Sequence, residues 1–256
     1  MLARDSSRRA FGRRWHTVAL AAAVHPNPPS SRGRVGSIER ALAIPAVSSA
    51  VREGLPLVGF LTALALLLGR WNRGVATALL ALAGFCLLFF RDPPRHAPDN
   101  PLAIVAAADG RILRIDRVEH EPFVGGPCIR LVTFLSLFDV HVNRSPVTGT
   151  IRLLERRRGG FGPTFDVERS DRNAAEIVGI EGTRGRLVVR RTAGLVARRI
   201  VTWVSPMESV VAGQKLGMLK FGSRTDLLLA EGKVTITVKE GDHVRAGSTV
   251  VARYRA

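Results

Sequence analysis

The chain has 256 residues, of which 46% are hydrophobic, and its formal net charge is +17. This length suits one sizeable domain with an appendage and does not require two full cores. The charge is carried almost entirely by arginine, because the 38 basic residues include only four lysines. Such a surplus attracts nucleic acid or an anionic membrane surface. With one Tyr and three Trp to stack on bases, we expect no nucleic-acid partner and favour the membrane.

Two cysteines, Cys86 and Cys128, are too few for a disulfide framework, and no cluster of residues has metal-ligand spacing. We therefore expect no bound metal and a reducing cytoplasm. Residues 1–37 are predicted to be a disordered Arg-rich extension, since they show no sustained periodicity. Their short apolar segment Thr17–Val24 resembles a targeting peptide, but it is brief and lacks a convincing cleavage site.

Residues 38–97 are predicted to form a membrane-associated helical hairpin. Two uncharged apolar runs, Leu55–Leu68 and Val75–Phe90, flank a polar segment that contains Arg70 and Arg73. Each run is short for a full span of about 20 residues, so a spanning and a re-entrant hairpin are both open. An even number of passes leaves both ends on one side, and we expect the cytoplasmic face of the cell membrane. The alternative is a hairpin buried in a soluble protein.

Residues 98–256 are predicted to be a β-rich domain, because short β-branched runs alternate there with Gly and Pro. Two segments echo each other, 209–219 and 242–252: each contains a short strand, a glycine and a second strand. This pattern resembles the two hammerheads of a barrel-sandwich hybrid core. The fold class we expect is mainly β, with an N-terminal apolar helical hairpin. The expected strands are Ile112–Val118, Ile129–Phe134, Thr150–Leu154, Glu176–Ile180, Arg186–Arg191, Arg199–Val204, Leu216–Lys220, Asp226–Ala230, Lys233–Val238 and Thr249–Tyr254.

Gly222-Ser223 stands between two apolar strand-like runs, as part of Lys220-Phe221-Gly222-Ser223-Arg224. In this setting the sequence resembles the short, archaeal-type phosphatidylserine decarboxylases, which are processed at a Gly-Ser pair. Other segments resemble the same family in order and spacing over roughly residues 50–256. They are Phe89–Arg95, Ala107–Gly110, Phe134–Gly149, Arg172–Glu176 and Ala193–Val201.

The resemblance implies a self-processing enzyme. The chain would split between Gly222 and Ser223 into a large chain, 1–222, and a small chain, 223–256, which stay associated as a heterodimer. Ser223 would become a covalent pyruvoyl group, the only cofactor. Its carbonyl would form a Schiff base with phosphatidylserine and accept the electrons released with carbon dioxide, leaving phosphatidylethanolamine.

The same resemblance makes His141 the proton donor, since an ordinary histidine pKa near 6.5 suits proton transfer at cytoplasmic pH. It also makes Asp109 the group that orients or polarises the base acting on Ser223. Longer bacterial relatives carry a second His at the position of Arg144. A complete Asp-His-Ser triad is therefore not expected, and either His141 serves both steps or another group is the base for processing.

Two residue types without a clear motif remain. Arg144, Arg198, Arg199 and Arg224 are able to bind the lipid phosphate, but in so arginine-rich a chain each is interpreted as a surface charge. His243, in Gly241-Asp242-His243, is interpreted as a turn residue.

Two other functions fit parts of the pattern. A membrane-anchored carrier or adaptor would share the hairpin and hybrid core, but Lys215 and Lys233 lack the setting of a modifiable lysine. A membrane-bound serine hydrolase would use Ser223, His141 and Asp109 directly, but the glycines on both sides of the serine in a nucleophile elbow are absent, since Arg224 and Thr225 follow Ser223.

Overall fold

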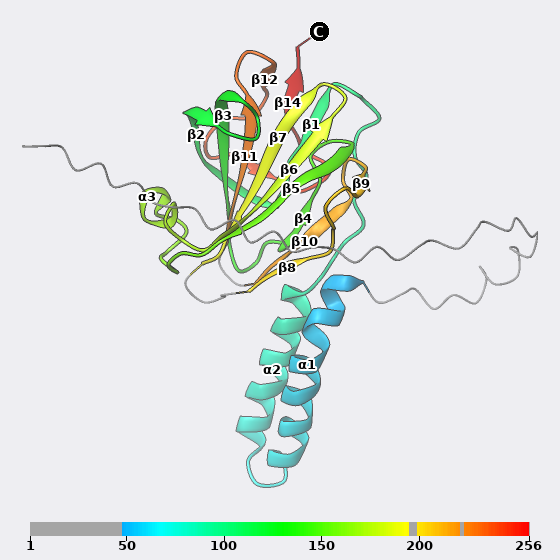
Figure 1. Cartoon of the computed structure of the whole chain (residues 1–256). Coiled ribbons are helices and arrows are strands. Elements are labelled where there is room, and N and C mark those ends of the chain that lie inside the picture. The colour runs from blue at the N-terminus through cyan, green and yellow to red at the C-terminus, as the bar shows by residue number, and fades with distance from the viewer. Residues whose placement is uncertain (1–47, 195–198, 221–222, 256) are drawn as a thin grey trace, which may run out of the picture. The chain divides into compact units, whose positions relative to one another are not determined.

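A computed structural model describes residues 48–194, 199–220 and 223–255. The predicted extension 1–37 lies outside these residues. The predicted fold class, mainly β with an N-terminal apolar helical hairpin, is confirmed (Figure 1). The domain limits at residues 37/38 and 97/98 stay predictions.

The hairpin consists of α1 (Ser49–Leu68) and α2 (Arg73–Phe89). Ser48 and Asn72 cap the two helices, because each side chain accepts a hydrogen bond from the third residue after it, Val51 and Val75. Gly69 ends α1 and leaves room for the reversal. Leu61, Ala83 and Cys86 form the buried seam between the helices.

The outward faces of the hairpin are apolar. Leu66 is 71% exposed and Phe60 is 63% exposed. Of the two helices, α1 is long and apolar enough to cross a membrane, at about 30 Å for 20 residues, whereas α2 has 17 residues. The rest of the described chain does not bury these side chains, and the hairpin could associate with a membrane.

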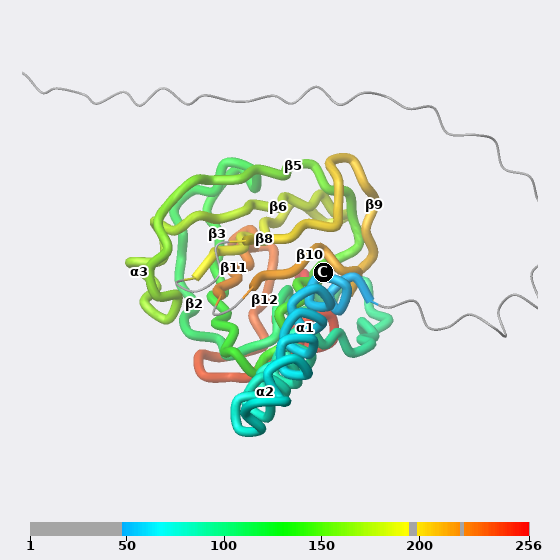
Figure 2. Tube along the Cα trace, turned by 90° about the horizontal axis from the view of Figure 1, so that it is seen from below, coloured from blue at the N-terminus to red at the C-terminus, as the bar shows by residue number. Residues whose placement is uncertain are grey.

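Eight strands form one curled antiparallel sheet, in the order β13-β2-β3-β11-β7-β6-β5-β9. Figure 2 shows the curl from β2 through β3 and β11 to β6 and β5. The bounds are β2 (Gly110–Glu121), β3 (Gly126–Leu135), β5 (Gly149–Arg157), β6 (Ala175–Gly182), β7 (Gly185–Thr192), β9 (Ser209–Val210), β11 (Ser223–Ala230) and β13 (His243–Val244). A one-turn helix, α3 (Val167–Ser170), lies between β5 and β6.

Two three-stranded sheets complete the domain. One has the order β1-β14-β12 and the other β4-β10-β8. The main core includes residues of all three sheets, for example Leu227 of β11, Val251 of β14 and Leu216 of β10. Leu228 points to the opposite face of the large sheet and joins a second cluster with Cys128. The bounds are β1 (Ala103–Val105), β4 (Val142–Arg144), β8 (Ile200–Thr202), β10 (Lys215–Leu219), β12 (Val234–Ile236) and β14 (Val250–Tyr254).

The predicted internal repeat forms two matching turns. Gly213 (φ 82°) lies between β9 and β10, and Gly247 (φ 72°) lies between β13 and β14. Each glycine donates its N–H to a facing main-chain oxygen, Gly213 to Ser145 and Gly247 to Ala106. A Cβ on Gly247 would lie 3.1 Å from Gly213 Cα. The two hammerhead turns therefore pack directly against each other, and the left-handed backbone at both positions explains the glycines.

All ten predicted strands coincide with observed strands. The sequence did not predict β1, β4, β9 and β13, which have two or three residues each.

Candidate functional site

One end of the large sheet brings together two of the predicted site residues, Asp109 and Ser223. Here β2 begins at Gly110, β3 ends at Leu135 and β11 begins at Ser223. Ser223 pairs with Leu135, and Phe134 pairs with both Arg111 and Arg224. The antiparallel register thus brings Asp109, just before β2, to the same end of the sheet as Ser223. A Cβ at residue 110 would collide with the main-chain oxygen of Phe134, so Gly110 permits this close approach.

Ser223 is fully buried. Its Oγ has no hydrogen-bond partner within the described residues, which is uncommon for a buried hydroxyl. The predicted cleavage partner, Gly222, lies outside the described residues. An unpaired buried hydroxyl at the first residue of a central strand fits a group held ready for chemistry.

His141 is fully buried just before β4, and its ring lies 4.3 Å from that of Phe89, centroid to centroid. Its Nδ1 lies 2.9 Å from the main-chain oxygen of Asp139. A carbonyl oxygen only accepts, so Nδ1 carries the hydrogen and Nε2 has the free lone pair. In the part of the chain that the structure describes, this Nε2 has no partner.

Burial lowers the pKa of His141 to about 4, with a smaller contribution from the charge of Arg91, while Asp139 opposes the shift. The expectation of an ordinary histidine pKa is therefore wrong. The ring is therefore neutral near pH 7, with a lone pair on Nε2 that is able to accept a proton.

The main chain connects His141 to Ser223. Leu219, the last residue of β10, donates its N–H to the main-chain oxygen of His141 at 3.0 Å. The chain then passes through Lys220 and the undescribed residues 221–222 to Ser223. His141 is thus fixed to the strand that leads into the predicted cleavage point.

Asp109 is almost fully buried, at 5% exposure. Its Oδ2 pairs with Arg95 at 2.9 Å, and its Oδ1 accepts the N–H of Ala246 at 2.7 Å. Burial raises the pKa of this carboxyl, although Ala246 and Arg95 act in the opposite direction. Asp109 lies at the same end of the large sheet as Ser223. Its described bonds, however, go to Arg95 and Ala246 rather than to Ser223 or His141.

Arg144, which replaces the second histidine of longer relatives, has a structural environment. It is 5% exposed and pairs with Asp92 at 2.8 Å, and it donates further bonds to the main-chain oxygens of Pro93 and Gly213. Asp92 also pairs with Lys215. Interpretation as a surface charge is wrong for Arg144: it ties the segment after the hairpin to a hammerhead turn. A guanidinium in this setting does not act as a base.

Comparison of the sequence with known proteins identifies the family. A sequence model described as phosphatidylserine decarboxylase matches residues 82–252. The chain belongs to the phosphatidylserine decarboxylase family.

Curated relatives agree over most of their length. A phosphatidylserine decarboxylase proenzyme of Carboxydothermus hydrogenoformans is 39% identical over 207 residues, covering 80% of this chain and 96% of the relative. One of Symbiobacterium thermophilum is 42% identical over 205 residues, covering 79% and 94%. One of Desulfotalea psychrophila is 35% identical over 204 residues, covering 79% and 95%. This phosphatidylserine decarboxylase family member is accordingly a carboxy-lyase.

Sequence reasoning missed a histidine–carboxylate pair in this decarboxylase. His243 Nε2 lies 3.0 Å from Asp139 Oδ1, while Asp139 Oδ2 accepts the N–H and hydroxyl of Ser136. Burial acts to raise the pKa of Asp139, but the bonds from Ser136 and His243 lower it overall. His243 therefore helps to hold the turn whose main chain binds His141. No local signal reveals the pair, because β13 and β2 bring together residues 104 positions apart.

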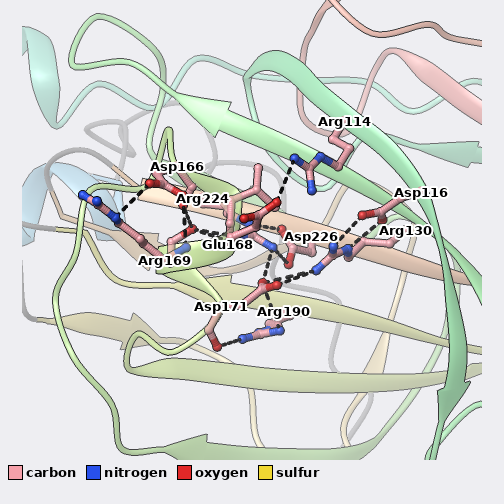
Figure 3. Close-up of polar contacts among 12 residues, drawn as sticks. Arg114, Asp116, Arg130, Asp166, Glu168, Arg169, Asp171, Arg190, Arg224 and Asp226 are labelled. Atoms are coloured by element: carbon pink, nitrogen blue, oxygen red, sulfur yellow. Dashed lines mark hydrogen bonds and ion pairs between the residues drawn. The ribbon is translucent and has the colours of Figure 1, made fainter.

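Arg224 also departs from its interpretation as a surface charge. It is fully buried and pairs with Asp226 and Asp171 at the centre of an ion network of the decarboxylase (Figure 3). Arg198 lies outside the described residues, so nothing follows for it. Among the residues that the structure describes, no group of three or more His, Cys, Asp or Glu side chains is arranged to hold a metal ion.

Proposed function

We propose that this protein is a self-processing decarboxylase that converts phosphatidylserine to phosphatidylethanolamine and carbon dioxide with a pyruvoyl group formed from Ser223. The observation that carries the proposal is that two buried atoms, Ser223 Oγ at the start of β11 and His141 Nε2 just before β4, have no hydrogen-bond partner within the described residues. Similar proteins named phosphatidylserine decarboxylase proenzyme support the substrate and the precursor state.

Self-processing begins at Ser223. Its Oγ attacks the carbonyl carbon of Gly222, the peptide C–N bond breaks, and the hydroxyl proton passes to the released nitrogen, so an ester replaces the peptide bond. Loss of the Ser223 Cα proton then expels the Gly222 carboxylate. The dehydroalanine left at position 223 takes up water and releases ammonia, which leaves a pyruvoyl group at the head of the small chain, 223–256.

His141 serves as the base in this scheme. Its neutral ring presents a free Nε2 lone pair, and the bond from Nδ1 to Asp139 fixes the tautomer. Arg144 does not compete for the role, because its guanidinium is paired with Asp92. Asp109 has an indirect role in this scheme. Its bond to the Ala246 N–H and its pair with Arg95 hold the segments around the site in place.

The residues present fit the pyruvoyl group, because position 223 is enclosed and its side-chain oxygen is unpaired within the described chain. Once formed, the group supplies a carbonyl that condenses with the substrate amine and accepts the electrons released with carbon dioxide. Arg224 holds the group through its main-chain nitrogen. His141 holds the proton that the substrate carbon takes up after carbon dioxide has left. The scheme needs no metal.

The two chains stay together as a heterodimer after processing. β11, the first strand of the small chain, lies between β3 and β7 of the large chain, 1–222. All of its residues except Ala230 are buried. Separation of the chains would require the centre of the sheet to unfold.

The hairpin of α1 and α2 associates with the membrane from its cytoplasmic face, and the arginine surplus favours an anionic lipid surface. Phe89 and Phe90 at the end of α2 pack with Val140 and Val142 around His141. The hairpin thereby brings a lipid substrate close to the domain that carries the site.

Intact mass of the purified protein tests the proposal. We expect two fragments, of which the smaller begins at position 223 and is lighter by one ammonia than a peptide with an N-terminal serine. Ser223→Ala blocks cleavage between residues 222 and 223. Ser209→Ala, at an exposed serine in β9, is the control and is cleaved like the wild type. A wild-type chain that stays whole and still decarboxylates phosphatidylserine would overturn the proposal, as would a carrier or hydrolase activity of the whole chain.

A further inference from the structure

The side chain of Arg224 has every donor bound. A guanidinium has five N–H groups, and Arg224 aims them at five acceptors. Nε and one Nη2 hydrogen go to the two oxygens of Asp226, at 2.6 and 2.7 Å. The other three go to α3 and the residue after it: the main-chain oxygen of Val167, Ser170 Oγ and Asp171 Oδ1, at 2.7 to 2.8 Å.

The surrounding charges balance. Figure 3 shows Arg224, Arg130 and Arg190 converging on Asp171, while Asp226 and Asp116 supply further carboxylates. Arg224 and Asp226 have no exposed side-chain area. A buried pair without its partners leaves an uncompensated charge, so each partner is needed to keep the others in place.

The position of Arg224 matters for the processed enzyme. If the bond before residue 223 breaks, residue 223 becomes a chain end whose only remaining covalent link is to the main-chain nitrogen of Arg224. Chain ends fray unless they are tied down. Among the described strands, Ser223 pairs only with Leu135 of β3, because the pairing of β11 with β7 begins at Arg224. The end that carries the reactive carbonyl therefore lies at the start of a central strand, at a position that pairs with only one of the two neighbouring strands.

We propose that Arg224 is a positioning residue whose five-bond clamp on Asp226 and on the segment Val167–Asp171 fixes the processed chain end against the large chain. The clamp joins the two chains formed by processing. Arg224 and Asp226 belong to the small chain, and the α3 segment belongs to the large chain. This inference rests on the proposed self-processing and deepens it. It also gives α3 a function, since this single turn supplies the large-chain half of the clamp.

Arg224→Lys is the first test, because lysine keeps the charge but has three donors on one atom and does not reproduce the fork. Processing is measured by intact mass, and the reactive carbonyl is titrated with phenylhydrazine. Decarboxylation of phosphatidylserine in vesicles is then expressed per titrated carbonyl. We expect kcat per carbonyl to fall by at least about tenfold with KM within about twofold, since a misplacement of about 1 Å costs up to 100-fold.

The matched control is Arg117→Lys. Arg117 also pairs with a carboxylate of the small chain, Glu231, at 2.7 Å, but at the other end of β2. Its kcat per carbonyl is expected to stay within about twofold of wild type. Asp171→Asn is the second variant: it keeps Arg224 and Asp226 but weakens the bond across the cut, and it is expected to reproduce the loss of kcat in part.

The outcomes separate the clamp from the proposed function. A wild-type protein that never splits defeats the proposed function itself. A wild type that splits, together with Arg224→Lys and Asp171→Asn variants that lower only the melting temperature and keep full kcat per carbonyl, overturns the clamp. If Arg224→Lys fails to fold, the kcat of Asp171→Asn decides.

Discussion

The main-chain oxygen of Asp139 accepts the Nδ1 hydrogen of His141 at 2.9 Å, which leaves His141 Nε2 as a free lone pair in a buried site. His141→Ala removes that lone pair, and we expect decarboxylation to fall by at least about 100-fold, in the range that general acid–base groups contribute. The assay is carbon dioxide release per mole of protein, and intact mass follows the split, because His141 is also the proposed base for processing. His120→Ala, at an exposed histidine in β2, is the control. Wild-type turnover by the His141 variant would rule out its role.

The lowered pKa of His141 predicts how stability depends on pH. Its folded pKa is about 4, because burial disfavours the charged ring, while an unfolded histidine has a pKa of about 6.5. Above 6.5 the ring is neutral in both states and the full stability is present. As the pH falls from about 6.5 towards 4, the unfolded state binds the proton first and stability is lost. Melting temperatures of uncleaved Ser223→Ala should show this decline, and adding His141→Gln should reduce its slope.

The environment of Arg144 predicts the result of restoring the second histidine. Arg144→His would break the pair with Asp92, whose carboxylate has no exposed area, and would lose the bonds to Pro93 and Gly213. We expect destabilisation of roughly 3 kcal/mol, seen as a melting temperature lower by about 5 °C or more, and no faster processing. A variant that melts like wild type and splits faster would show that this position has room for a processing base.

Local pattern made the strands and the hairpin predictable, and long-range pairing made parts of the site unpredictable. The run Leu227-Leu228-Leu229 is apolar because the strand is buried on both faces, which a sequence window reveals. The three acceptors of Arg224 in the segment Val167–Asp171 could not be predicted in this way, since α3 reaches Arg224 only through the folded sheet. The same holds for His243 and Asp139. The pKa of His141 depends on its burial beside Phe89, which no motif encodes.

The pair of Asp139 and His243 predicts two graded losses. Asp139→Ala removes the acceptor of the Ser136 N–H, the Ser136 hydroxyl and His243. It loosens the turn that fixes the His141 tautomer, so we expect kcat to fall by about tenfold. His243→Gln removes only the half-exposed member and should cost about threefold or less. Equal kcat in both variants and wild type would show that the turn does not position His141.

The exposed apolar faces of the hairpin predict how the protein meets lipid. Leu66 and Leu67 near the end of α1 are 71% and 56% exposed. Replacing both with Asp places two charges where the proposal puts hydrocarbon, at a cost of a few kcal/mol each. We expect the double variant to lose flotation with vesicles that contain anionic lipid. Val211→Asp is the control, because Val211 is a similarly exposed apolar residue in the β-rich part, at 59%, and it should float like wild type. Flotation of the Leu66/Leu67 variant to the same extent as wild type would exclude the hairpin as the membrane contact.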